Sequence, residues 1–247
     1  MAAGPLQASR AALVIVCAGQ LPSWRSCLMR TFTRGWFENE SIWLHMSYKY
    51  LLELLRTGLA SEFFTDAQTM LVPFMNPHVY GRSVLENCSF LASSANPDPT
   101  TRGRGFIARL SGSTAEFIQM WLWLTAGRTP FFLEEGQLRF RLQPRLPAAW
   151  FARAARTARW RDTPVVIPAD ALACALFGSI LLVYHNPARA DCFGPAAARP
   201  VRYLLDQQEA IDSEILNADW AERIRRRTVR RLDVWLEGAA PGRSSPR

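Results

Sequence analysis

The stretch FFLEEGQLRFRLQP, residues 131–144, decides how the second half of the chain is predicted to fold. After a turn at Glu135-Gly136, apolar and polar side chains alternate from Gln137 onward. A period of two residues is typical of a half-buried β-strand. A later run, CALFGSILLVYHNP at residues 174–187, predicts another strand or hairpin. Residues 131–205 are therefore expected to form a β-rich unit.

The residues before this stretch show a helical period instead. In ENESIWLHMSYKYLLELLRTGL, residues 38–59, apolar side chains recur every four positions, and Gly58 is suited to end a helix. The apolar stripe expected on this helix contains Ile42, Met46, Tyr50, Leu51, Leu54 and Leu55. A second helix is predicted in SEFFTDAQTMLVPFM, ending near Pro73, and a third from Ser113 to about Ala126. The boundary between helical and β-rich parts should fall near residues 128–137.

A long loop is predicted between the second and third helices, from residue 76 to residue 104. Its segments NPHVYGRS and SSANPDPTTRGRG are rich in Pro, Gly, Asn and Ser. Loops of this length in compact domains are more often functional than not.

Composition limits the possible classes of protein. The chain has 247 residues, of which 49% are hydrophobic, so it can bury a sizeable core. The formal net charge is +8, and six of the arginines lie in RIRRRTVRR, residues 223–231. Such a run can bind nucleic acid or a membrane surface. A solvated terminal helix or tail is the favoured interpretation, because no aromatic residue interleaves the run to stack on bases.

The cysteines and histidines suggest neither a disulfide framework nor a metal site. The five cysteines include no CxxC pair, and the three histidines, His45, His78 and His185, share no metal-ligand spacing. This usage fits a reducing cytoplasm. The apolar stretch AALVIVCAG, residues 11–19, is too short to span a bilayer.

The candidate site lies in RLSGSTAEFIQMW, residues 109–121. Ser113 is suited to cap a helix, and Glu116 would complete a capping box. Ser111 and Gly112 have no role in such a box, and with the free N–H groups of a helix start they suit an anion such as phosphate. A tight entry turn explains them as well. His45, in the first predicted helix, is at least as well explained as a packed core residue as it is as a ligand.

Five segments, in order, resemble the last part of glycoside hydrolase family 94, the inverting phosphorylases of cellobiose and related β-glucans. These segments are ESIWLHMSYKYLLELLRTGLASEFF, NPHVYGRS, GRGFIARLSGSTAEFIQMW, GQLRFRLQPRLPAAW and VYHNPARADCFGP. The resemblance implies the C-terminal portion of an (α/α) barrel over residues 36–130. A small β-sandwich-like unit would follow over residues 131–205. Residues 1–35 stay unassigned, and residues 206–247 form an Arg-rich tail.

The resemblance also implies an activity. In these enzymes inorganic phosphate attacks the anomeric carbon of a β-glycoside, with inversion, and releases a sugar 1-phosphate. The positions that match the family's phosphate-binding residues are His45 and Ser111 with Gly112, and Ser113 joins them as the helix cap. The family pattern continues with Gly-Trp, where this chain has Glu116 and Phe117.

No residue of this chain matches the family's catalytic aspartate, so no catalytic residue is assigned. The chain is accordingly expected to be a C-terminal fragment that is inactive alone, with an oligosaccharide and inorganic phosphate as ligands and no other cofactor. A missing N-terminal portion or an oligomer would cover its exposed face. The alternatives are a non-catalytic carbohydrate-binding scaffold and, less favoured, a basic nucleic-acid-binding protein. No specific nucleic acid, membrane or metal is expected.

Overall fold

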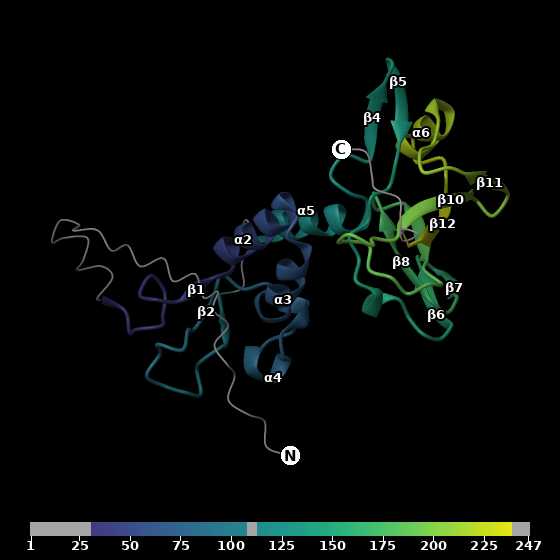
Figure 1. The fold of residues 1–247 in the computed structure, drawn as a ribbon. Helices are drawn as coiled ribbons and strands as arrows, with labels where there is room; N and C mark the ends of the chain where they lie inside the picture. Colours follow the sequence, from purple (N-terminus) through teal and green to yellow (C-terminus); the bar gives the residue numbers. More distant parts are fainter. Residues whose placement is uncertain (1–30, 108–112, 239–247) are drawn as a thin grey trace. The chain divides into compact units, whose positions relative to one another are not determined.

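The computed structural model describes residues 31–107 and 113–238, and the chain divides into two compact units (Figure 1). Unit 1 is Met1–Met120 and unit 2 is Trp121–Arg247. The division falls inside a helix, α5 (Ser113–Thr125), whereas the change of sequence period placed it between residues 128 and 137. Each unit is described by itself.

Unit 1 combines three longer helices with a small antiparallel sheet. Its elements are β1 (Ile42–Trp43), α2 (Leu44–Thr57), α3 (Ala60–Met70), η1 (Val72–Phe74), α4 (Pro77–Tyr80), β2 (Phe90–Leu91), β3 (Gly105–Phe106) and the first part of α5. The sheet has the order β1-β2-β3. The three predicted helices are confirmed, whereas the loop predicted between the second and third also contains the short helix α4 and the strand β2.

The buried face of helix α2 is rotated about the helix axis relative to the predicted face. Leu44, Tyr48, Leu51 and Leu55 are fully buried, at the three- and four-residue spacing of one helix face. Tyr50, expected in that stripe, instead donates a hydrogen bond from its hydroxyl to Asp66 on α3, at 2.8 Å. The helix ends where Gly58 takes the left-handed conformation, as predicted, with φ of 88°.

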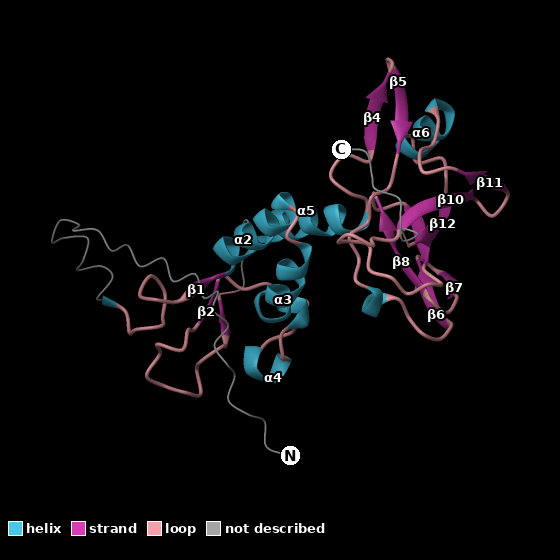
Figure 2. Ribbon diagram, in the orientation of Figure 1, coloured by secondary structure: helices cyan, strands magenta, loops and turns pink. Residues whose placement is uncertain are grey.

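Unit 2 is mainly β-structure, shown in magenta in Figure 2. Its elements are β4 (Phe131–Glu134), β5 (Gln137–Phe140), η2 (Ala148–Trp150), β6 (Arg156–Trp160), β7 (Thr163–Ile167), β8 (Ala171–Leu176), β9 (Ile180–His185), β10 (Arg199–Leu205), β11 (Glu209–Asp212), α6 (Ala218–Arg225) and β12 (Arg231–Glu237). The largest sheet has the order β11-β10-β12-β9-β8. The strand in QLRFRLQP is confirmed, and so is the hairpin of β8 and β9.

The turn at Glu135-Gly136 joins β4 and β5 as predicted. Both residues have positive φ, 51° and 76°, as required in the two-residue hairpin turn whose twist matches that of the flanking strands.

The hairpin of β6 and β7 packs onto the large sheet. Ala158, Trp160 and Val165 of that hairpin lie against a buried cluster that includes Leu181 and Val183 of β9.

The expectation of an Arg-rich tail from residue 206 onward is wrong. Residues 209–237 contribute β11, α6 and β12, and β12 is the central strand of the sheet, parallel to β9. Leu232, Val234 and Leu236 are fully buried at a spacing of two. This strand period follows directly after the arginines, and the high charge of the run concealed it.

The expected fold class, the C-terminal portion of an (α/α) barrel followed by a sandwich-like unit, is also wrong. Among the described residues the helices form no part of a barrel, and antiparallel sheets dominate. The sequence predicted α2, α3 and α5, but a local pattern carries no information about how helices are arranged in space. The barrel came from the resemblance alone.

Candidate functional site

The start of α2 is held by a backbone hydrogen bond to the neighbouring loop. β1 leads directly into the helix, and Leu44 N–H donates to the carbonyl oxygen of Ser89, at 3.1 Å. His45 is the second residue of the helix and is only partly exposed. Its ring lies edge-to-face on Trp43, with 5.8 Å between ring centroids. The imidazole is thus positioned in the first turn, where helix N–H groups favour negative charge.

The start of α5 carries the other predicted residues. Ser113 is the first helical residue and is fully buried, while Ser111 and Gly112 lie outside the described residues. Glu116 Oε2 is buried and has no hydrogen-bond partner, so this oxygen takes no part in a capping box. A buried acceptor without a partner is uncommon in folded proteins.

Tyr48 and Phe117 join the two helix starts. Their ring centroids are 6.3 Å apart, and Figure 1 draws α2 and α5 side by side. Tyr48 lies one helical turn after His45, and Phe117 lies one turn after Ser113. Both predicted residues are therefore within a turn of the same contact.

Hydrogen bonds hold the Tyr48 hydroxyl in place. It donates to Asn87 Oδ1 at 3.1 Å and accepts from Val72 N–H at 3.2 Å. Burial raises the pKa of Tyr48 to about 12, although the Val72 N–H works in the opposite direction. The hydroxyl is thus neutral at physiological pH and fixes α2 against two loops.

The chain enters the predicted anion loop through an unusual backbone conformation. Ile107 has φ of 58°, which is uncommon for a β-branched residue. The carbonyl oxygens of Phe106 and Ile107 both accept from Ser89 N–H, the residue that also holds Leu44. Ser89 therefore ties the entry of α2 to the strand that precedes α5.

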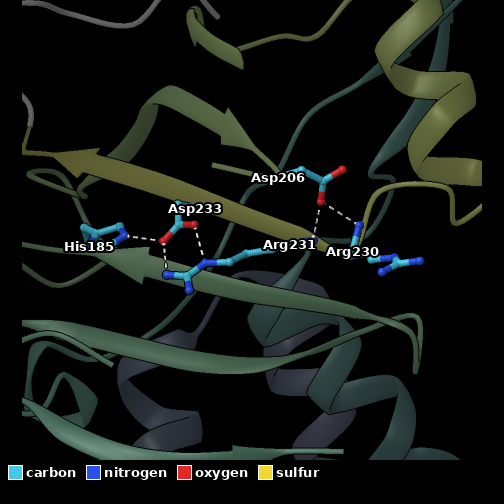
Figure 3. A network of polar contacts seen from close by, with 5 residues as sticks. All are labelled: His185, Asp206, Arg230, Arg231 and Asp233. Atoms are coloured by element: carbon cyan, nitrogen blue, oxygen red, sulfur yellow. Dashed lines mark hydrogen bonds and ion pairs between the residues drawn. The ribbon is translucent and has the colours of Figure 1, made fainter. Parts of the chain in front are cut away.

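A second polar cluster lies in unit 2, around Asp233 of β12 (Figure 3). His185 Nε2, at the end of β9, is 2.8 Å from Asp233 Oδ1. Arg231 donates from Nε to Oδ2 at 2.6 Å and from Nη2 to Oδ1 at 2.9 Å. Burial alone would raise the pKa of Asp233, but the hydrogen bonds from His185 and Arg231 lower it below its ordinary value.

This cluster is a structural support rather than a reaction centre. Both carboxylate oxygens of Asp233 are occupied, and the residue is 3% exposed. The His185 ring stacks on Trp235 at 4.5 Å between centroids, with 11° between planes. Asp206 accepts from the N–H groups of Arg230 and Arg231, which fixes the start of β12 (Figure 3).

The described part of the chain offers no metal centre. It contains no group of three or more His, Cys, Asp or Glu side chains that could hold a metal ion. Nor does any described helix have the length and apolar character needed to cross a membrane.

Four arginines of the run form ion pairs within unit 2. Arg225 and Arg226 both pair with Glu222, at 3.5 and 2.6 Å. Arg223 Nη1 is 3.5 Å from Glu209 Oε1, and the Arg231 side chain is taken up by Asp233. Much of the charge that the run carries is therefore balanced within unit 2.

A pocket lined by arginines in unit 2 was not found from the sequence. Arg128, Arg141, Arg145 and Arg199 surround it together with Glu214. These residues are scattered over the chain, and only the folding of unit 2 collects them.

In comparisons with known proteins, the chain matches no protein-family model and none of the curated proteins.

Proposed function

We propose that the chain binds inorganic phosphate and an oligosaccharide in unit 1 and takes part in phosphate-dependent cleavage of β-glycosides. The observation that carries the proposal is the contact between α2 and α5. His45 and Ser113 lie in the first turns of these two helices, each one turn from the Tyr48–Phe117 contact. The resemblance of the surrounding segments to inverting phosphorylases supports the same reaction.

Each group has a distinct task in this proposal. Helix N–H groups and the His45 imidazole donate hydrogen bonds to phosphate oxygens. Glu116, in the first turn of α5, accepts a hydrogen bond from a sugar hydroxyl through its carboxylate. Phosphate takes the place of the attacking water of an inverting hydrolase, so no base is needed to activate it. The proposal assigns no proton donor among these residues.

The cysteines support action in the cytoplasm, which belongs to the same proposal. Cys88, Cys174 and Cys192 are free thiols, and burial raises the pKa of Cys192 to about 11. Cysteines that form no disulfide are typical of proteins in a reducing compartment.

The test is phosphate binding by the full chain, measured by calorimetry. His45→Ala should weaken phosphate affinity at least about tenfold, a loss of about 1.4 kcal/mol, because a donor to the anion is removed. His78→Ala is the matched control, since His78 is exposed on α4. Circular dichroism of both variants checks the fold.

Glu116→Gln tests the sugar side of the site separately. It should weaken binding of a β-glucan oligosaccharide while leaving phosphate affinity unchanged or improved, because a negative charge near the anion is removed. The proposal is wrong if His45→Ala and His78→Ala bind phosphate equally well. It is also wrong if neither phosphate nor oligosaccharide binds the folded chain.

A further inference from the structure

The arginine pocket of unit 2 is formed by the chain that follows α5. Arg141 N–H donates to the carbonyl oxygen of Pro130, and Arg145 N–H donates to that of Leu124, both at 2.8 Å. Because of these hydrogen bonds, residues 141–145 run alongside the end of α5 and the turn that follows it. The pocket measures about 260 Å³. Pockets for drug-sized ligands hold about 300–1,000 Å³, so this one suits a small ligand.

Gly127 permits this close packing. It has φ of 90°, and a Cβ there would lie 2.9 Å from Gln143 Cβ. On the opposite side, Tyr203 accepts from Leu142 N–H at 3.3 Å and donates to the Glu214 carbonyl oxygen at 3.1 Å. The wall that carries Arg141 is therefore fixed from both sides.

Basic residues outnumber acidic ones in the lining of the pocket. Four arginines line it, and Glu214 is the one acidic residue in the lining that the structure describes. Among the described residues, neither Arg141 nor Arg199 forms an ion pair. Burial lowers the pKa of Arg145, and the charge of nearby Arg128 lowers it further. Like charges gathered in this way are stabilised by an anion.

Arg141 carries a donor that no protein group satisfies. Its Nε is buried and has no hydrogen-bond partner, while its guanidinium lies over the Phe132 ring, 5.1 Å from the centroid. Leaving a buried donor unpaired costs about 1–3 kcal/mol, and more when the group is charged.

We propose that this pocket binds a phosphate group, either free or esterified to a small sugar, with Arg141 as the principal donor. Arginine is suited to the role because its planar fork matches phosphate oxygens. Glu214 accepts from a hydroxyl when the ligand is a sugar phosphate. This site lies in unit 2 and does not depend on the His45 site of unit 1.

Protection from chemical modification tests the site in the wild-type chain. An arginine-selective dicarbonyl reagent is applied with inorganic phosphate, with glucose 1-phosphate, or with glucose, and modified arginines are located by mass spectrometry. Phosphate and glucose 1-phosphate should each slow modification of Arg141 and Arg145 at least threefold, and glucose should not. Stronger protection by glucose 1-phosphate identifies the sugar phosphate as the preferred ligand, whereas equal protection identifies free phosphate as sufficient.

Matched variants complete the test. Arg141→Gln should weaken phosphate affinity at least tenfold, whereas Arg156→Gln, which removes the same charge from the exposed strand β6, should not. His45→Ala should leave the protection of Arg141 unchanged, so the two sites fail or succeed separately. Equal modification of Arg141 with and without phosphate, or equal affinity in the two arginine variants, would overturn the proposal.

Discussion

At the scale of single residues, Asp233 shows how a buried charge is retained. It is tied to Arg231 and His185 by three contacts of 2.6–2.9 Å on the face of the sheet opposite the buried Leu232 and Val234. Asp233→Asn removes the negative charge and places an NH₂ group where His185 or Arg231 already points a hydrogen-bond donor. We expect a loss of about 3 kcal/mol in the free energy of unfolding at pH 7, measured with guanidinium chloride.

The same residue predicts a dependence on pH. The folded-state pKa of Asp233 is lowered below its ordinary value, so its contribution is present at neutral pH and is lost as the pH falls through that lowered pKa. The difference in stability between wild type and Asp233→Asn should therefore shrink in acid. Asp212→Asn is the control, because Asp212 is exposed and its ion pair with Arg202 is long, at 3.5 Å. A pH-independent difference at Asp233 would contradict this account.

At the scale of elements, the contact between β3 and α4 depends on a missing side chain. A Cβ on Gly105 would lie 2.3 Å from Cε2 of the buried Tyr80 ring and 2.8 Å from Cys88 Sγ. Gly105→Ala should therefore destabilise unit 1 by about 1–3 kcal/mol through overpacking. Hydrogen exchange should show faster opening of β2 and β3.

Gly238→Ala provides the comparison for this substitution. Its Cβ would meet only Ala190 Cβ, at an ordinary 3.8 Å. It should change thermal stability by less than about 0.5 kcal/mol. If Gly105→Ala is as mild as Gly238→Ala, then Tyr80 moves freely and does not fix β3.

At the scale of the whole molecule, the charge of +8 predicts weak attraction to nucleic acid. Ion pairs already engage Arg223, Arg225, Arg226 and Arg231. DNA binding, followed by fluorescence anisotropy, should therefore be independent of sequence and fall steeply as salt is added, since phosphate neutralisation is its source. Replacing Arg227 and Arg230 by Gln should reduce both the affinity and the slope against salt. Binding with sequence preference at high salt would refute this.

Local patterns predicted some of the elements of this protein. The four-residue period predicted α2, Pro73 predicted the end of the second helix, Gly58 predicted the end of α2, and the alternation from Gln137 predicted β5. These features depend on neighbouring residues, because side chains a turn apart share a helix face and alternate side chains share a strand face. Ser113 was predicted as a residue at a helix start, whereas His45 was predicted inside the first helix and lies in the first turn of α2.

The tertiary structure decided what joins residues far apart in the chain. It placed β12 between β9 and β10, brought Asp233 to His185, 48 positions away, and gathered Arg128, Arg141 and Arg199 around one pocket. It also replaced the expected barrel by two smaller units. Pairings of this kind are selected by burial and packing over the whole unit, whereas a sequence pattern reports only which face of each element is apolar.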